Sequence, residues 1–318
     1  MEVFVWVLEA VLMLLGIGIV GFWVARRNVI PENVQGFLIQ LAVNIALPCL
    51  VFSSILVNFS PKELPDWWQL PLWWFAFAAI SLVLSLIAGF MSNKDTRSEF
   101  IINLFFQNGL FFPLIIIGGV FGQDAPYLPQ LYIFIILHPV MFFSTYPFFF
   151  KRSSGQHPSE SLWRRVVNPI LVATVLAIVM QLADVKDYLP DFIYSILETL
   201  AGMALPLIMI ILGGSLYLDF KQKGTIYYKE IAKFLVIKNI VFPLALLGIL
   251  LLWRPSYNIA LLFFLQAAVP PVTATPILTE RVGGNKAIST QFVLSSFIFS
   301  MITVPATFNL FSQFFPMP

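Results

Sequence analysis

The chain has 318 residues, of which 59% are hydrophobic and only 11% charged, and its formal net charge is +2. A soluble domain of this length could not cover its surface with so few charges, so the composition predicts a membrane protein. The single cysteine, Cys49, excludes an intrachain disulfide and a cysteine-based metal cluster.

A transmembrane helix needs roughly 20 apolar residues. Apolar runs of this kind follow one another along the chain, and we number them as predicted helices 1 to 10: 3–25, 34–56, 68–91, 100–120, 128–150, 163–182, 190–217, 231–252, 257–279 and 287–313. The first run has no basic residues before it and exceeds the apolar part of a signal peptide, so we expect it to remain as helix 1. The predicted fold class is an all-α polytopic membrane protein.

The loops between these helices differ in charge. Odd-numbered loops carry 14 of the 18 basic residues, even-numbered loops carry Lys62, Lys186 and Arg254, and Lys238 lies inside helix 8. An excess of Lys and Arg marks the cytoplasmic side of a membrane protein. We therefore expect an inner-membrane protein with both termini on the periplasmic side.

Two stretches of the chain repeat at one offset of 158 residues. Ala46-Leu47-Pro48 recurs as Ala204-Leu205-Pro206, and the stretch from Ser98 to Pro113 recurs from Ser256 to Pro271. Five helices per repeat force the second copy to run inverted, as in many secondary transporters. The predicted domains are residues 1–150, a cytoplasmic linker at 151–162, and residues 163–318. Chance similarity between Phe- and Leu-rich segments is the alternative.

Enzyme chemistry has no support in the sequence. It contains no HExxH, Walker or GxSxG pattern, which would indicate metal, nucleotide or acyl-transfer chemistry. We therefore expect no enzyme, no metal site, no cofactor and no nucleic-acid partner. A coupling proton or sodium ion stays open.

Several segments resemble the auxin efflux carrier family in their order along the chain. They are Asn44–Pro48, Asn168–Leu171, Ala204–Leu207, Gly213–Leu216, Lys238 with Pro243, Gln266–Pro271 through Glu280, Ser289-Thr290 and Pro305. The family includes plant auxin exporters and bacterial permeases for malate and malonate, and its wider superfamily includes bile-acid sodium symporters.

The resemblance implies an elevator-type carrier. Helices 1, 2, 6 and 7 would form a scaffold that dimerises, and helices 3–5 and 8–10 would form a moving transport domain. Helices 4 and 9 would break at their prolines and cross in mid-membrane. The family usually places the proline of helix 4 further from the asparagine than Pro113 lies from Asn108. The exact crossover residue in helix 4 is therefore left open.

Polar residues beside these prolines are the candidate substrate-binding residues. A proline leaves backbone groups unpaired, and the half-helix that follows offers N–H donors with positive dipole character. Asn108 and Gln266 occupy equivalent repeat positions and could donate to a carboxylate. The full candidate set is Asn108, Gln266, Gln107, Asn103, Pro113, Pro270, Pro271, Thr273 and Thr275. Hydrogen bonds between helices are the alternative role of the polar members.

Ionisable residues within the spans are candidates for charge or coupling roles, because they are costly in a membrane. Lys238 could attract an anion or replace a coupling cation, or its side chain could reach back to the membrane surface. Glu198 and His138 are candidate proton-coupling residues. The paired glycines Gly213 and Gly214 are expected to allow close contact between helices.

The function expected from these observations is secondary transport of small organic anions, namely mono- or dicarboxylates such as malate, malonate or auxin-like acids. The lipid bilayer and a second copy of the chain would be its partners. Two alternatives remain: a sodium-coupled symporter of bulkier amphipathic anions, and a membrane sensor that does not transport. Direction of transport and the coupling ion stay open.

Overall fold

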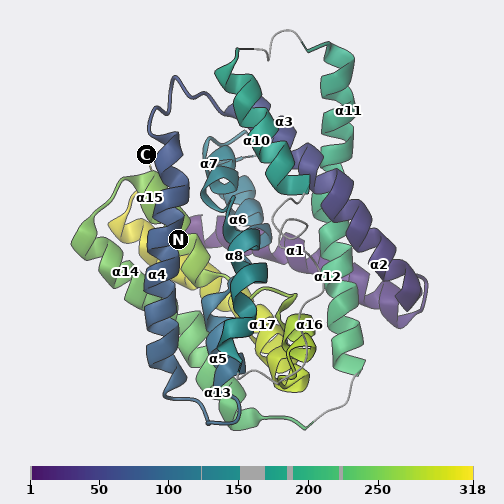
Figure 1. The fold of residues 1–318 in the computed structure, drawn as a ribbon, viewed down its shortest axis with the longest axis vertical. Coiled ribbons are helices and arrows are strands. Elements are labelled where there is room, and N and C mark those ends of the chain that lie inside the picture. The colour runs from purple at the N-terminus through teal and green to yellow at the C-terminus, as the bar shows by residue number, and fades with distance from the viewer. Residues whose placement is uncertain (1, 123, 151–168, 185–188, 222–224, 318) are drawn as a thin grey trace.

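The computed structural model describes residues 2–122, 124–150, 169–184, 189–221 and 225–317. Within these ranges the fold is all-helical, and the only strand-like feature is one isolated β-bridge between Gln107 and Pro271. The linker predicted at 151–162 lies outside the described residues. Figure 1 shows helices of both halves of the chain interleaved side by side.

The first half of the chain contains one long helix followed by several interrupted ones. These elements are α1 (Glu2–Arg26), α2 (Glu32–Leu41), η1 (Ala42–Ala46), α3 (Leu47–Asn58), η2 (Trp67–Gln69), α4 (Leu70–Gly89), α5 (Arg97–Phe105), α6 (Phe111–Phe121), α7 (Tyr127–Phe134), α8 (His138–Thr145) and η3 (Tyr146–Phe149).

The second half shows the same mixture of long and interrupted helices. Its elements are α10 (Pro169–Leu182), α11 (Asp191–Gly202), α12 (Ala204–Lys221), α13 (Tyr228–Val236), η5 (Ile237–Val241), α14 (Phe242–Trp253), α15 (Tyr257–Ala268), α16 (Thr275–Arg281) and α17 (Lys286–Phe314).

Six helical stretches of the described chain are long and apolar enough to cross a membrane: Phe4–Arg26, Gly36–Asn58, Trp67–Gly89, Asp191–Ser215, Tyr228–Trp253 and Lys286–Phe314. They overlap predicted helices 1, 2, 3, 7, 8 and 10 with ends that differ by up to three residues, and they confirm a multi-pass membrane protein. Predicted helices 4, 5 and 9 each consist of two shorter helices, and helix 6 begins in residues outside the described ranges. The ten-helix inverted repeat stays a prediction.

Prolines explain two of the irregular turns. The π-helical turn η1 leads directly into α3, which carries Pro48 in its first turn, and η5 leads into α14, which carries Pro243 in the same place. A proline cannot donate the usual backbone hydrogen bond and clashes with the turn before it. A widened π turn lets the helix pass such a residue without ending.

Close packing joins helices that are far apart in the sequence. The backbone of α12 at Gly213 lies against the backbone of α1 at Gly18, so that a Cβ on Gly213 would lie 1.8 Å from the Gly18 carbonyl oxygen. The reverse contact is made by Gly21, whose Cβ would lie 2.2 Å from the Ile210 carbonyl oxygen. The expected role of Gly213 in close helix contact is therefore confirmed.

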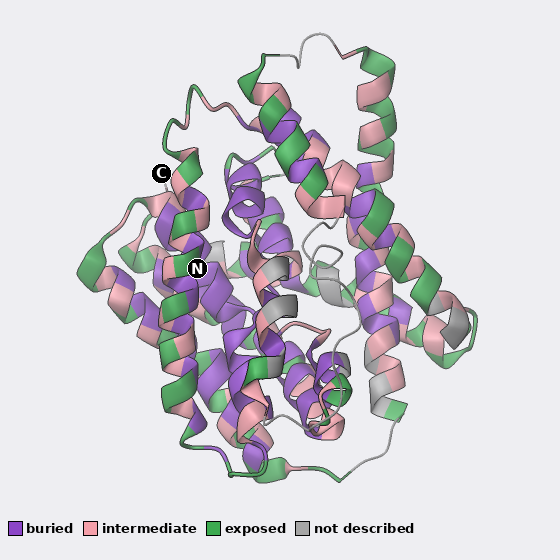
Figure 2. Cartoon of the chain, viewed as in Figure 1, coloured by how far each residue is buried: buried purple, intermediate pink, exposed green. Residues whose placement is uncertain are grey.

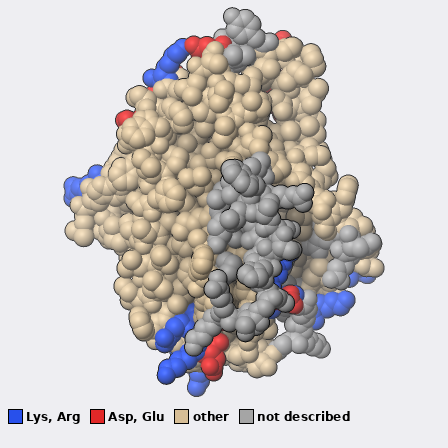
Figure 3. Space-filling view, viewed as in Figure 1, with Lys and Arg blue, Asp and Glu red and all other residues tan. Residues whose placement is uncertain are grey.

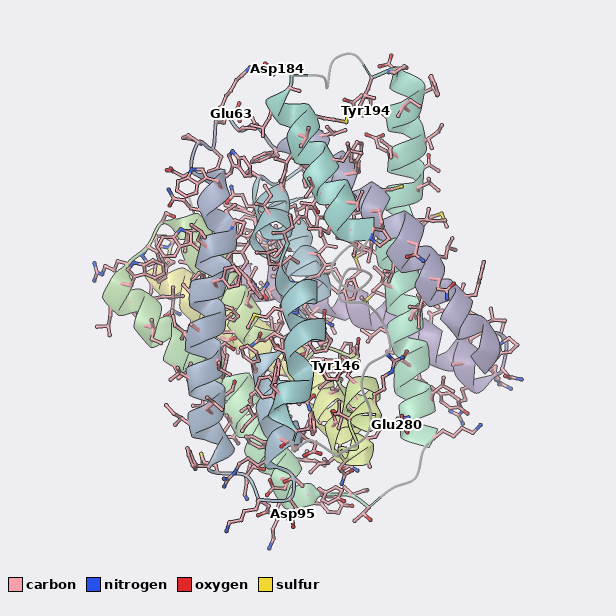
Figure 4. All side chains as sticks on the ribbon, viewed as in Figure 1. Glu63, Asp95, Tyr146, Asp184, Tyr194 and Glu280 are labelled. Carbon is pink, nitrogen blue, oxygen red and sulfur yellow. The ribbon has the colours of Figure 1, made fainter. Side chains whose placement is uncertain are left out.

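The distribution of apolar and charged side chains over the surface is the one that a membrane protein needs. Buried residues concentrate on α6 and α7 at the centre, while the outer helices expose large apolar side chains such as Leu252 and Ile302 (Figure 2). On the visible face most charged side chains lie at the upper and lower ends, with an uncharged band between them (Figure 3). Asp95 marks the lower end, and Glu63 and Asp184 mark the upper one (Figure 4).

Candidate functional site

Two non-helical segments meet inside the molecule, and we call them the junction. Residues 106–110 separate α5 from α6, and residues 269–274 separate α15 from α16. The segments run antiparallel. The backbone N–H of Asn108 donates to the Pro270 carbonyl at 2.8 Å, and that of Val272 donates to the Phe106 carbonyl at 3.0 Å. The two interrupted helices are thus hydrogen-bonded to each other where each is broken.

The prolines determine where α15 ends. Pro270 and Pro271 have no N–H groups, so the carbonyls of Gln266 and Ala267, four residues earlier, have no helical partner. The helix accordingly stops at Ala268. In the other segment the interruption precedes the proline, because Pro113 is the third residue of α6. The first turn is where a helix tolerates a missing N–H group.

The side chain of Gln266 forms a hydrogen bond across the junction. Its Nε2 donates to the Gly109 carbonyl at 2.8 Å, although the two residues are 157 positions apart. Gln266 is fully buried, and its Oε1 has no hydrogen-bond partner among the described residues. That oxygen occupies the space beside Gly109, where a Cβ would lie only 2.1 Å from it. Gln266, a predicted substrate-binding residue at the repeat position equivalent to Asn108, thus contacts Gly109 of the first half of the chain directly.

Among the described residues, the buried side-chain amide of Asn108 is a hydrogen-bond donor without an acceptor. Its side chain is only 5% exposed, and its Nδ2 has no hydrogen-bond partner among the described residues. The first turn of α6 begins three residues later, at Phe111. Unpaired backbone N–H groups of a helix N-terminus carry partial positive charge. Asn108 therefore lies next to a region that favours a negative charge.

The remaining polar candidates have structural partners. Gln107 Nε2 donates to Ser81 Oγ at 2.9 Å and to the Leu104 carbonyl at 3.0 Å, which ties the junction to α4. Thr275 Oγ1 donates to the Val272 carbonyl at 2.7 Å and so closes the start of α16. Thr273 is partly buried in the junction. Asn103 bonds elsewhere, as described below.

Lys238 lies within the turn η5 and is fully buried. Its Nζ donates to the Ala267 carbonyl at 3.1 Å and lies 4.9 Å from the centre of the Phe242 ring. Ala267 is one of the residues whose carbonyl a proline leaves unpaired. The ammonium group thus caps the end of α15 and does not reach the membrane surface. Among the described residues, no carboxylate lies within ion-pair distance of it.

Three other ionisable residues of the predicted spans, His138, Glu198 and Glu9, have different surroundings. His138 begins α8, and its ring packs against Trp74 and Phe106, at 5.7 and 6.2 Å between ring centres. With Gln107 it lines a small cavity in which about 10 Å³ is open to the centre of a water molecule, room for about one water. Glu198 is exposed on α11 and Glu9 is exposed on α1. The structure therefore brings His138, but neither glutamate, to the junction.

Sequence reasoning missed Glu99. It was treated as a loop residue, but it lies in the first turn of α5 with only 4% of its surface exposed. Its Oε1 accepts a hydrogen bond from the Asn285 backbone N–H at 2.7 Å. The spacing could have indicated this burial: Glu99 and Asn103 are four residues apart, so on a helix they lie on the same face. No group of three or more His, Cys, Asp or Glu side chains gathers elsewhere in the described chain.

Replacing Gly109 by alanine tests the contact with Gln266. We expect the new methyl group to displace the Gln266 amide and lower stability by about 1–3 kcal/mol, the usual cost of overpacking. Adding Gln266→Ala removes the clash, so the double variant should be more stable than the sum of the two single effects predicts. Thermal unfolding of the three purified variants measures this. Additive losses would show that the two residues do not interact.

Two comparisons with known proteins bear on this site. A family model described as membrane transport protein matches residues 6–307, nearly the whole chain. The chain is also 24% identical over 214 residues to an uncharacterized transporter of Methanocaldococcus jannaschii, in a match that covers 66% of this chain and 68% of that protein. Both proline-interrupted segments and Lys238 lie within the range of the family model.

Proposed function

Because the chain belongs to the membrane transport protein family, as its resemblance to the auxin efflux carriers predicted, we propose that it carries small organic anions through the junction. The family and the relative are transporters, so the protein is a membrane transporter and not an enzyme. The proposed substrates are mono- or dicarboxylates of the size of malate, malonate or an auxin-like acid. The family description names no substrate, so this substrate class is our proposal.

One observation carries the anion proposal: the buried Nδ2 of Asn108 has no hydrogen-bond partner among the described residues and lies next to the first turn of α6. A buried donor without an acceptor is costly unless a ligand or water accepts from it. A carboxylate oxygen is a suitable acceptor, and the N-terminus of α6 favours its charge. Lys238 Nζ, which donates to the carbonyl of Ala267 two residues before the second segment of the junction, supplies a further buried donor.

The mechanism we propose is an elevator-like movement. Helices α1, α2, α3, α10, α11 and α12 would form the scaffold, and α4 to α8 with α13 to α17 would carry the junction. Each set packs internally: α1 packs against α12 and α3 against α10 and α11, while α4 packs against α5, α7 and α15. Because α1 also packs against α6 and α17, the proposed movement would have to slide along that contact. The scaffold would also form a homodimer. Residues 1–150 and 163–318 would be the two inverted repeats.

The proposal also covers the orientation of the chain in the membrane and the residue that would couple transport to a proton. We propose that both termini lie on the periplasmic side of the inner membrane, because the basic loops would then face the cytoplasm. His138, in a cavity beside Gln107, is the proposed proton-coupling residue of the candidate set, because it adjoins the junction. Glu198, exposed on α11, could act only indirectly, through the scaffold.

A second substrate class has one observation in its favour. The cavity beside Gln107 is lined by Trp74, Phe77, Phe105 and Phe106 in addition to His138. The cavity holds about one water as it stands, so an amphipathic anion would have to part these side chains, whose rings would then pack against its apolar body. A carrier of bulkier amphipathic anions, as in the bile-acid symporters, is therefore the runner-up.

Ligand-induced stabilisation of the purified protein tests both classes. A ligand that binds only the folded state raises stability by roughly RT ln(1 + [L]/Kd). We expect small mono- or dicarboxylates at millimolar concentration to raise the Tm, and Asn108→Ala to abolish that rise. The matched control, Asn309→Ala, changes a partly buried amide on α17 and should retain it.

The other outcomes separate the alternatives. A rise with amphipathic anions only would favour the runner-up. A rise that persists in Asn108→Ala would move the binding site away from the junction. Failure of every carboxylate to stabilise the wild type would overturn the anion proposal.

A further inference from the structure

A buried polar cluster lies below the junction, between α5 and the turn that joins α16 to α17. Its members are Glu99 and Asn103 on α5, Thr279 on α16 and Ser289 on α17. Glu99 is 4% exposed and the other three are fully buried. The four side chains supply carboxylate, amide and hydroxyl oxygens, which are the ligands that hard cations prefer.

Hydrogen bonds hold the cluster together and determine which atoms remain free. Asn103 Nδ2 donates to the Glu99 carbonyl at 2.8 Å and to Ser289 Oγ at 2.9 Å, and Thr279 Oγ1 donates to Ser289 Oγ at 3.4 Å. Because both N–H groups of the Asn103 amide are engaged, its orientation is determined. Its Oδ1 is buried and has no partner among the described residues. An acceptor oxygen is thus left free beside a buried carboxylate.

Among the residues that the structure describes, the carboxylate of Glu99 has no basic partner. Arg97 stacks over the Phe90 ring at 5.3 Å, and Lys286 pairs with Glu280 at 2.8 Å. Lys233 pairs in the same way with Glu230 at 2.7 Å. Within the described chain no ion pair includes Glu99. A buried charge without a partner is costly, so buried carboxylates are normally paired or bind a cation.

We propose that Glu99, Asn103, Thr279 and Ser289 form a binding site for a monovalent cation, sodium, that is coupled to transport. One carboxylate balances one positive charge, and the free Asn103 Oδ1 and the Thr279 hydroxyl oxygen supply neutral ligands. Ser289 Oγ accepts hydrogen bonds from both Asn103 and Thr279 and so holds these two side chains in place. The site joins the first half of one interrupted helix to the second half of the other. A cation there would hold α5 and α16 together and so stabilise the junction. The coupling part of this inference rests on the proposed transport function.

The test measures thermal unfolding of the full-length protein in sodium chloride and in choline chloride at equal ionic strength. We expect sodium to raise the Tm of the wild type in a saturable way, by roughly 2–4 °C. Glu99→Gln should abolish the rise. Glu280→Gln is the matched control, because it removes an exposed carboxylate near the same turn, and it should keep the rise.

A second variant covers the case in which Glu99→Gln does not fold. Ser289→Ala removes a single hydroxyl, and we expect the sodium concentration for half-maximal stabilisation to increase at least tenfold. No sodium-specific rise in the wild type, or an equal rise in Glu99→Gln, would overturn the cation site. A Tm that instead rises with acid in the wild type but not in Glu99→Gln would replace sodium by a proton.

Failure of the cation site is distinguishable from failure of the proposed function. Carboxylate-induced stabilisation in choline chloride reports on the substrate site alone. If it persists while sodium has no effect, anion binding stands and the cation site is wrong. If sodium stabilises but no carboxylate does, the cation site stands and the substrate class is wrong.

Discussion

Gly213→Ala is expected to destabilise the protein by more than about 3 kcal/mol, above the usual cost of overpacking. The new Cβ would lie 1.8 Å from the Gly18 carbonyl oxygen and 2.9 Å from the backbone nitrogen of Phe22. All nearby atoms belong to the backbone of α1, which cannot turn aside as a side chain can. The two helices would have to separate along their contact, which would also loosen the packing around it.

The measurement is the apparent Tm of the detergent-purified variant, which we expect to fall by roughly 6 °C or more. Gly21→Ala should behave similarly, because its Cβ would meet the Ile210 backbone of α12 at 2.2 Å. Gly16 is the control on the same helix: nothing lies within 4 Å of its Cβ position, and alanine there should be neutral or stabilising. Equal effects at Gly16 and Gly213 would contradict close helix packing as the cause.

Lys238→Met should reduce carboxylate binding strongly while leaving stability unchanged or higher. The substitution keeps an unbranched side chain of similar size and removes a fully buried ammonium group that has no ion-pair partner in the described chain. Removal of a costly buried charge is commonly neutral or stabilising. The positive charge next to the junction is lost, so an anion should bind at least tenfold more weakly, which corresponds to about 1.4 kcal/mol.

Two measurements on one variant separate the possible roles of Lys238. The Tm without ligand reports stability, and the carboxylate concentration for half-maximal stabilisation reports binding. Lys229→Met, which removes an exposed charge from neighbouring α13, is the control and should change neither. A large loss of Tm with unchanged carboxylate binding would make Lys238 a purely structural cap of α15 through Ala267.

Spans and interruptions were predictable because they depend on local properties of the chain. Apolar length identifies a membrane helix, and a proline removes a hydrogen bond at a known position. The end of α15 before Pro270 follows directly. The start of α6 does not, because Pro113 fits into a first turn and the interruption moves ahead of it.

The candidate site was predictable only in part. The repeat offset gave Asn108 and Gln266 equivalent positions, and the structure brings their neighbourhoods together, since the backbone N–H of Asn108 donates to the Pro270 carbonyl. Asn103 shares the same apolar run but bonds to Ser289 instead. Side chains on one helix point in different directions, and the spacing of residues in the sequence does not show which neighbouring helix each side chain contacts.

The sequence by itself determined that this is a helical membrane protein with interrupted segments in both halves, and the family follows from its motifs. The tertiary structure alone decided that Gln266 bonds to Gly109, that Lys238 caps α15 and that Glu99 is buried without a basic partner in the described part of the chain. The physical reason is that these contacts join residues from 29 to 186 positions apart. Burial and pairing at such distances depend on how the helices pack, which no local pattern encodes.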